Sequence, residues 1–411
     1  MATGPAPSCE WIEQTLRAAL LEDGRRLLEE LLMRVPVAEA TPQPSQRVYH
    51  SRRCDVISIF GPLTLCRDYY HPAGPEGGFP LDQALGLVGG FTPGAARILS
   101  RTAAQLPYGE SSQQVRELAG LNVDATQIKR LVGLLSEAAQ TRIQQLPEPA
   151  TVASDLFYIS VDGTGVPMVR GELEGRGGRQ PDGQAKTREV KLAAFFTQSS
   201  VDEEGCPVRD PDTTTYLASF ESSAQFGLAV RQAARQRAMA QARQVIYLGD
   251  GAAWIWEVAR TCFPQAVQIL DYYHASEHVV ALAKACYSDP GCAQNWARRW
   301  QSLIYDSQLE TLVEEAQAVA DPVDPEERQR ELDYLQRNQA RMDYLRYRRE
   351  GWFIGSGVVE AGCKRVIGQR LKQSGMFWTE AGATAVASLR CALLSAGGWD
   401  HLWSQPMLQA A

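Results

Sequence analysis

The chain has 411 residues, of which 45% are hydrophobic and 22% charged, and its formal net charge is −7. These fractions are typical of a globular protein with one large core or a few ordinary ones, so they exclude a disordered scaffold. No stretch approaches the roughly 20 apolar residues of a membrane helix, and the N-terminal residues lack the basic and apolar regions of a signal peptide. We therefore expect a cytoplasmic protein with no membrane partner.

The nine cysteines are scattered and contain no Cys-x-x-Cys spacing. This pattern predicts reduced thiols used as small apolar residues, and it offers no zinc ribbon. The net negative charge argues against indiscriminate nucleic-acid binding. It leaves local binding open, because affinity follows the phosphates that a basic surface neutralises.

The first part of the chain, residues 1–106, is predicted to be mainly helical with one short strand pair. Apolar residues at helical spacing over 8–33 indicate a helix or helix pair. Residues 55–60 and 63–70 alternate like two antiparallel strands, with Gly61-Pro62 as the turn. Residues 81–106 are predicted to be helical around a Gly-Gly break.

Residues 107–146 have the pattern of a helix-turn-helix. Two short amphipathic helices, opened by the capping pairs Ser111 with Gln114 and Asp124 with Gln127, meet at a turn. A helical hairpin on the surface of a bundle has the same pattern, so these residues alone leave DNA binding and plain packing equally open. In a DNA-binding module, the second helix would offer Gln127, Lys129 and Arg130 to a major groove.

The chain changes character after the Pro147–Pro149 linker. Strand-like runs cover 156–161, 188–197, 213–221, 245–249 and 266–270, with helices predicted at 222–243 and 252–262. The Gly-rich stretch Glu172–Gly183 is predicted to be a hairpin tip. This order predicts a mixed α/β sheet whose ligand edge lies at the strand exits.

We assign the first part of this core to residues 150–276. Residues 277–350 are polar and almost all helical, and they are predicted to be an insertion. Residues 351–411 then complete the core with C-terminal helices, the last running from Thr379 to Ser395.

Two of the predicted buried strands run directly into Asp-Gly pairs, Asp162-Gly163 and Asp250-Gly251. An Asp-Gly turn after a strand is common. A carboxylate carried out of a dry sheet nevertheless needs a cation, a hydrogen-bond network or a substrate, because burying it unpaired is costly. Two such pairs in one sheet favour a functional site.

A third acid, Glu360, lies in a basic stretch. Ser356 can cap a helix there, which puts Glu360 on one face with Lys364. As a surface ion pair this arrangement contributes little. Between Arg341 and Lys372, however, eight basic residues accompany only three acids, and a cationic strip around one carboxylate suits a polyanionic substrate.

Several motifs occur together in this chain: Asp-Gly-Thr, Leu-Gly-Asp-Gly-Ala-Ala-Trp-Ile-Trp, Leu-Asp-Tyr-Tyr-His-Ala-Ser-Glu-His, Gly-Ser-Gly-Val-Val-Glu-Ala-Gly-Cys-Lys and, near the end, Trp-Asp-His-Leu-Trp. With them, roughly residues 107–403 resemble bacterial insertion-sequence transposases of the ISKra type. Asp271-Tyr-Tyr-His274 is also similar to the Asp-x-x-His signature of Mutator-like transposases. Relatives often carry a Cys-rich zinc ribbon after the strand pair, where this chain has residues 71–75 instead, so we predict no zinc there.

The resemblance implies a ribonuclease-H-like catalytic domain with an Asp-Asp-Glu triad on Asp162, Asp250 and Glu360. It implies double-stranded DNA as partner, a homodimer on DNA, and two Mg²⁺ or Mn²⁺ ions as cofactors. We expect Asp162 to bridge both ions, Asp250 to hold one and Glu360 the other. Asp271 is an alternative ligand to Glu360, and His274 is an accessory donor or a structural histidine. The DNA backbone would lie along Lys364, Arg365, Arg370 and Lys372.

Two other readings remain open on the residues. His274-x-x-Glu277-His278 matches the inverted zinc-peptidase signature, which leaves the two Asp-Gly strands unexplained. The chain can also be a transposase-derived DNA-binding protein without catalysis, although all three predicted carboxylates are present. A Rossmann nucleotide site is excluded, since no G-x-G-x-x-G follows a strand.

Overall fold

The computed structural model describes residues 8–35, 46–71, 78–147, 155–175, 177, 185–237 and 239–405. The chain divides into an N-terminal unit (Met1–Ala139 with Asp400–Ala411) and a sheet unit (Gln140–Trp399). Residues 72–77, Glu148–Pro149 of the predicted linker and most of the predicted hairpin tip Glu172–Gly183 lie outside the described residues. No helix in the described ranges is long and apolar enough to cross a bilayer.

The N-terminal unit begins with one 25-residue helix, α1 (Cys9–Met33), which confirms the helix predicted there. Ser8 caps it by accepting the Trp11 N–H at 3.2 Å. One side lies close to the neighbouring hairpin, since a Cβ on Gly24 would come within 2.7 Å of Phe60. Along the same helix, a row of apolar side chains is 50–62% exposed: Ile12, Leu16, Leu20, Leu27 and Leu31.

The strand pair is an antiparallel hairpin of β1 (Arg47–Ser58) and β2 (Gly61–His71). Ser58 pairs with Gly61, so the two-residue turn is Ile59-Phe60 and the predicted Gly61-Pro62 turn is two residues too late. Gly61 has φ +104°, a conformation that glycine adopts without strain. A small core of Val56, Leu65 and Leu87 lies beneath the hairpin.

Five helices follow the hairpin, and three of them, α3, α4 and α5, pack on one another. Gly120, at φ +72°, turns the chain after α4, and Asp124 forms the predicted capping box with Gln127 at the start of α5. The other predicted cap is wrong: α4 begins at Tyr108, and Ser111 is buried inside it, donating to the Leu106 carbonyl. The bounds are α2 (Pro80–Leu85), α3 (Pro93–Gln105), α4 (Tyr108–Ala119), α5 (Ala125–Leu134) and α6 (Ser136–Gln144).

The sheet unit is built on five strands in the order β7-β4-β3-β8-β9. Strand β3 is antiparallel to β4 and parallel to β8, β4 is antiparallel to β7, and β8 is parallel to β9. This mixed α/β sheet confirms the predicted class, with the strand order and directions of a ribonuclease-H-like fold. The bounds are β3 (Leu156–Pro167), β4 (Thr187–Gln198), β7 (Thr215–Ser219), β8 (Gln244–Gly249) and β9 (Val267–Leu270), with a small side hairpin of β5 (Ser200–Val201) and β6 (Pro207–Val208).

Strand β3 is longer than predicted, and this changes the setting of Asp162. The parallel ladder with β8 ends at Val161, while the antiparallel ladder with β4 continues to Pro167. Asp162 therefore lies inside a strand that is paired on one side only, and not in a turn at the strand's exit.

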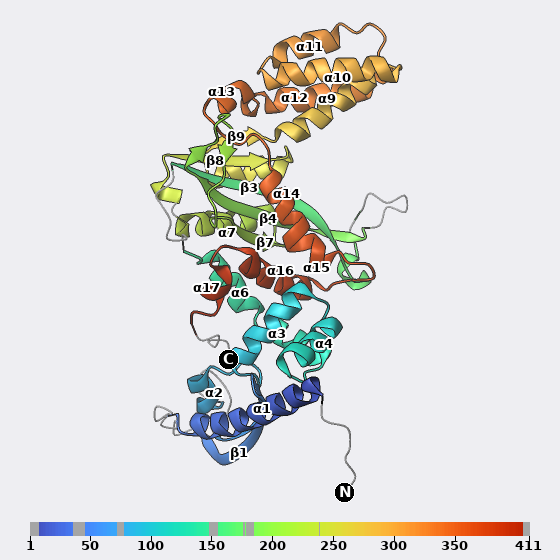
Figure 1. The fold of residues 1–411 in the computed structure, drawn as a ribbon. Helices are drawn as coiled ribbons and strands as arrows, with labels where there is room; N and C mark the ends of the chain where they lie inside the picture. Colours follow the sequence, from blue (N-terminus) through green and yellow to red (C-terminus); the bar gives the residue numbers. More distant parts are fainter. Residues whose placement is uncertain are drawn as a thin grey trace. The chain divides into compact units, whose positions relative to one another are not determined.

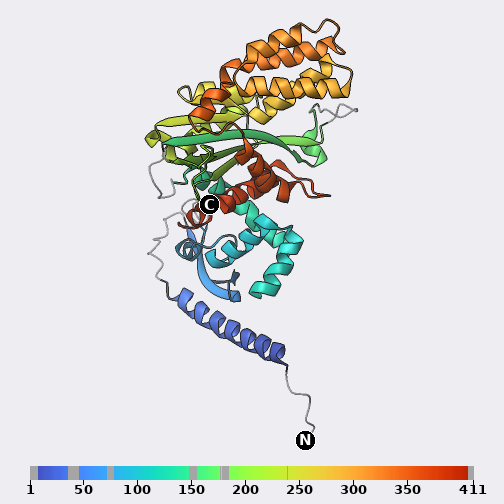
Figure 2. The same ribbon diagram turned by 45° about the horizontal axis from the view of Figure 1, so that its top comes forward.

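The two faces of the sheet carry different helices (Figures 1 and 2). Helices α7 (Ser223–Gln236) and α8 (Ala253–Cys262) cover one face: Arg237, just after α7, lies over the Phe195 ring at 4.7 Å. The opposite face carries α14 (Gly357–Gly362), because a Cβ on Gly362 would come within 3.0 Å of Leu192 and 2.8 Å of Tyr216.

The helical insertion projects from the β9 edge of the sheet (Figure 1). It starts at Tyr272, five residues before the predicted boundary, because Asp271 caps its first helix. Its helices are α9 (Tyr272–Cys286), α10 (Pro290–Tyr305), α11 (Leu309–Gln317), α12 (Pro325–Asn338) and α13 (Tyr344–Arg349).

After α14 the chain continues through a π-helical segment, Cys363–Gly368, into the short α15 (Gln369–Leu371). The long helix α16 (Glu380–Leu394), capped by Thr379, confirms the predicted terminal helix. It runs beside β7, and its end is tied by the Tyr216 N–H, which donates to Ser395 Oγ at 2.8 Å. Helix α17 (Gly398–Leu402) follows.

Candidate active site

Three aspartates stand at one level along the edge where the parallel strands end. Val161 pairs with Gly249, and Gly249 pairs with Leu270. Asp162, Asp250 and Asp271 each follow one of these residues directly. The Asp271 N–H extends the ladder by donating to the Gly249 carbonyl at 2.8 Å. The sheet register alone therefore places three carboxylates on adjacent strands.

Helix α14 brings the fourth acid to the same face. Asp162 pairs across strands with Leu192, so both side chains lie on the face that α14 covers. The Cys363 thiol, at the end of α14, lies close enough to the Asp162 carboxyl to lower its pKa. Glu360 lies one turn earlier and accepts from Ser356 Oγ at 3.0 Å.

Within the described residues, the group that could hold a metal ion is Asp271, His274 and Glu360, whose ligand atoms all lie within 4.8 Å of one another. His274 and Glu360 are half-buried, and Asp271 is fully buried. Oxygen and imidazole donors of this kind suit Mn²⁺ and Zn²⁺ as well as Mg²⁺.

Asp271 already has a full set of hydrogen-bond donors. Its Oδ1 accepts the N–H groups of Tyr273 and His274 at 2.6 and 3.0 Å, which caps α9. Its Oδ2 accepts the Ser356 N–H at 2.5 Å and also the Ser356 hydroxyl. Four donors occupy about as many lone-pair sites as a carboxylate has. Asp271 thus joins the start of α9 to the start of α14, and a metal ion would have to displace one of these donors.

The electrostatics single out Asp162. Burial raises the pKa of its carboxyl, and the neighbouring Asp250 charge raises it further, while the Cys363 thiol, the Gly163 N–H and His274 act in the opposite direction. Burial and the Asp162 charge in turn raise the pKa of the Cys363 thiol, which stays protonated as a donor. A carboxyl in this setting gains from a nearby cation.

Asp250 lies in a tight turn after β8. Its Oδ1 accepts the Ala252 N–H at 3.0 Å, and Gly251 takes a φ of +100°. The turn fixes the carboxylate at the strand end, next to Asp162.

Three of the four predicted backbone-binding cations near the site are exposed: Lys364, Arg365 and Lys372. Lys372 Nζ donates to Thr164 Oγ1, two residues beyond Asp162 on β3. Arg370 corrects the expectation, because it is 1% exposed, lies 5.1 Å from the centre of the Trp378 ring and donates to Met376 Sδ. Its guanidinium is part of the core and does not face DNA.

The predicted recognition helix α5 exposes Gln127, Lys129 and Arg130 and buries Ile128, Leu131 and Val132. The Gln127 side-chain carbonyl is used in the capping box, where it accepts the Asp124 N–H. The two cations are therefore the side chains that α5 offers most directly to a phosphate backbone.

The His-x-x-Glu-His motif does not assemble as a peptidase site. His274 belongs to the carboxylate group, whereas His278 Nδ1 bonds to Glu331 Oε2 at 2.5 Å and Glu277 is exposed. The two histidines serve different partners.

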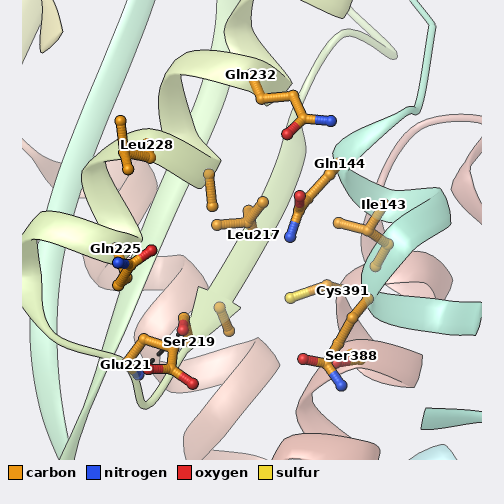
Figure 3. Close-up of a pocket in the computed structure, with 13 residues that line it drawn as sticks. Ile143, Gln144, Leu217, Ser219, Glu221, Gln225, Leu228, Gln232, Ser388 and Cys391 are labelled. Carbon is orange, nitrogen blue, oxygen red and sulfur yellow. Dashed lines mark hydrogen bonds between the residues drawn. The ribbon is translucent and has the colours of Figure 1, made fainter. Parts of the chain in front are cut away.

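A separate cavity of about 430 Å³ lies between α6, α7, β7 and α16 (Figure 3). Its lining is mainly neutral amide and apolar side chains, among them Gln144, Gln232 and Leu217, and Glu221 is the carboxylate in it. Leu217 pairs with Ala193, whose side chain lies on the face opposite to Asp162. This cavity is not the carboxylate site.

Sequence reasoning missed the residues that organise the site: Cys363, Thr164 and the double role of Ser356. Cys363 lies three residues after Glu360, a spacing that puts the two on one helical face, so the signal was present.

No protein-family model and no curated protein matches this chain. Among solved structures, it is similar to one described as "Drosophila P element transposase strand transfer complex", at 7% identity over 76% of this chain and 81% of that chain, with a TM-score of 0.27.

Proposed function

We propose that the protein is a DNA transposase of an insertion sequence, which cuts DNA at the ends of the element and joins them to target DNA. The observation that carries the proposal is the register of β3 and β8, which sets Asp162 beside Asp250 on the edge that α14 reaches with Glu360. Strand transfer is a phosphoryl transfer, and carboxylates gathered at the edge of a mixed sheet suit that chemistry.

Carboxylate oxygens such as those of Asp162, Asp250 and Glu360 would suit a pair of Mg²⁺ or Mn²⁺ ions. Carboxylates about 4 Å apart repel by roughly 4 kcal/mol per pair at an effective dielectric of 20. The raised pKa of the Asp162 carboxyl, due first to burial and then to the Asp250 charge, has the direction that such crowding predicts. Hard oxygen ligands with room for water and phosphate are what Mg²⁺ prefers.

In this proposal Asp162, Asp250 and Glu360 are the residues that would hold the ions. Bound divalent ions would activate the attacking oxygen and neutralise the leaving one. Asp271 acts through Ser356, which it holds in place to orient Glu360. His274 donates to a phosphate or to the leaving oxygen.

The proposed DNA contacts lie in both units. Lys364, Arg365 and Lys372 follow the backbone near the carboxylates, and α5 contacts the terminal inverted repeats with Lys129 and Arg130. Joining two ends in one reaction requires two active sites, so we propose a homodimer on DNA.

The Asp162→Asn variant tests the assignment. It keeps the side-chain shape and removes the bridging charge, so Mg²⁺-dependent nicking of the flanking inverted repeats should fall at least about 1,000-fold, while the gel-shift affinity for the same DNA stays within about twofold.

Asp155→Asn is the matched control, because Asp155 lies just before the other end of the same strand and pairs only at the surface with Arg243. Robust nicking by Asp162→Asn would reject the triad. Binding without nicking by the wild-type protein, in Mg²⁺ and in Mn²⁺, would favour the non-catalytic DNA-binding alternative.

A further inference from the structure

The turn that carries Asp250 is held from outside the sheet. Tyr334, on α12 of the helical insertion, donates its hydroxyl to the Asp250 carbonyl at 2.8 Å. A Cβ on Gly251 would lie 2.2 Å from this hydroxyl oxygen, so only glycine leaves room for the contact.

Tyr334 is itself fixed by the helix that follows β9. Its ring stacks on His278 of α9 with centroids 3.5 Å apart and planes 21° from parallel. His278 is held by Glu331, which is 5% exposed and lies one turn before Tyr334 on α12. Helices α9 and α12 thus hold one rigid hydroxyl against the turn.

We propose that Tyr334 is a positioning residue for Asp250, and that the helical insertion sets the geometry of the second carboxylate through this one hydrogen bond. The catalytic role of this contact rests on the proposed function. The contact itself is given by the hydrogen-bond distance and the ring stacking.

A neutral hydroxyl is the right group for this task. Burial raises the pKa of Tyr334, and the charges of Asp250, Asp271 and Glu331 raise it further, so the phenol remains a donor at any physiological pH. Without that donor, the Asp250–Gly251 backbone keeps the hydrogen bond from the Ala252 N–H to Asp250 Oδ1. Glycine at φ +100° gives little resistance to rotation.

The test compares Tyr334→Phe with Tyr344→Phe in the full-length protein. Both variants keep the ring and lose one hydroxyl that donates to a backbone carbonyl, on Asp250 in the first case and on Leu270 at 3.0 Å in the second. Hydrogen exchange by mass spectrometry follows the peptide Gly249–Ile255, and calorimetry with Mn²⁺ measures metal affinity.

For Tyr334→Phe we expect faster exchange confined to this peptide and a Mn²⁺ Kd raised by roughly fivefold, as one hydrogen bond predicts. Tyr344→Phe should change neither by more than about twofold. Equal exchange in wild type and Tyr334→Phe, or equal effects of both variants, would overturn the inference.

The two readouts separate this inference from the proposed function. If the wild-type protein binds no Mn²⁺ but Tyr334→Phe still loosens the turn, the positioning contact is real and the metal assignment has failed. If the wild-type protein binds Mn²⁺ but Tyr334→Phe does not loosen the turn, the positioning role of Tyr334 has failed and the metal assignment stands.

Discussion

Asp271 shows how a carboxylate in a cluster of acids can be structural. It is fully buried and accepts four hydrogen bonds, two from the start of α9 and two from Ser356. A metal ligand normally keeps lone pairs free for the ion. The half-buried Glu360 carboxylate can do this more readily than the Asp271 carboxylate. These hydrogen bonds are why we propose Asp271 as a positioning residue and Glu360 as the metal ligand.

This assignment predicts a large stability effect for Asp271→Ala. The change strands buried donors on two elements, so the free energy of unfolding should fall by about 3 kcal/mol in urea denaturation. Glu360→Ala leaves the Ser356 hydroxyl with Asp271 as its acceptor, so it should cost less than about 1 kcal/mol. Similar costs for the two variants would argue against the structural role of Asp271.

Site residues that are marked by their neighbours along the chain could be predicted from the sequence. Site residues whose role depends on a partner far away in the chain were missed. Asp162 and Asp250 stand out because each follows a run of buried residues and precedes glycine. Arg370 has the same local signature as Lys372, and only its packing on Trp378 separates a core cation from a surface one. Tyr334 has no local signal, since its partner Asp250 is 84 residues away.

The π-helical segment at Cys363–Gly368 is the least predictable element of the site. A π turn inserts one residue into a helix and rotates the side chains that follow, and such turns are frequent at functional sites. Here it begins at Cys363, the residue whose thiol lowers the pKa of the Asp162 carboxyl. Nothing in the local sequence requires it, because an ordinary helix satisfies the same apolar spacing.

Strand and helix bounds were predicted well where apolar runs are long. Those of β4 and α16 differ from the expectation by one residue at each end. The prediction failed where pairing decides the extent: β3 continues beyond Asp162 because β4 offers a partner through Thr187, while β8 has already ended. The Ser111 cap failed because that serine is buried within α4.

Helix α5 carries a prediction of its own. Replacing Lys129 and Arg130 together with alanine removes two exposed cations, so affinity for the inverted repeats should weaken and the slope of log K against log salt should fall by about 2. Stability should not change, since neither side chain is buried.

The control is the pair Arg26→Ala and Arg34→Ala on α1, whose side chains are 68% and 76% exposed in the same unit. An equal loss of binding in the control would mean that α5 contributes only general positive charge.

The two units of the molecule correspond to the two proposed tasks, DNA binding and catalysis. Helix α5, which we propose binds the DNA ends, belongs to the N-terminal unit, and every carboxylate of the site belongs to the sheet unit. The predicted boundaries at 106, 146 and 350 stay predictions. The contacts divide the chain after Ala139 and group residues 400–411 with the N-terminal unit.

Anomalous diffraction from Mn²⁺-soaked crystals of the protein would locate the proposed metal pair. We expect two Mn²⁺ peaks about 4 Å apart, one contacted by Asp162 and Asp250 and the other by Asp162 and Glu360. A single peak held by Asp271 and His274 without Asp162, or no peak at this edge at saturating Mn²⁺, would contradict it.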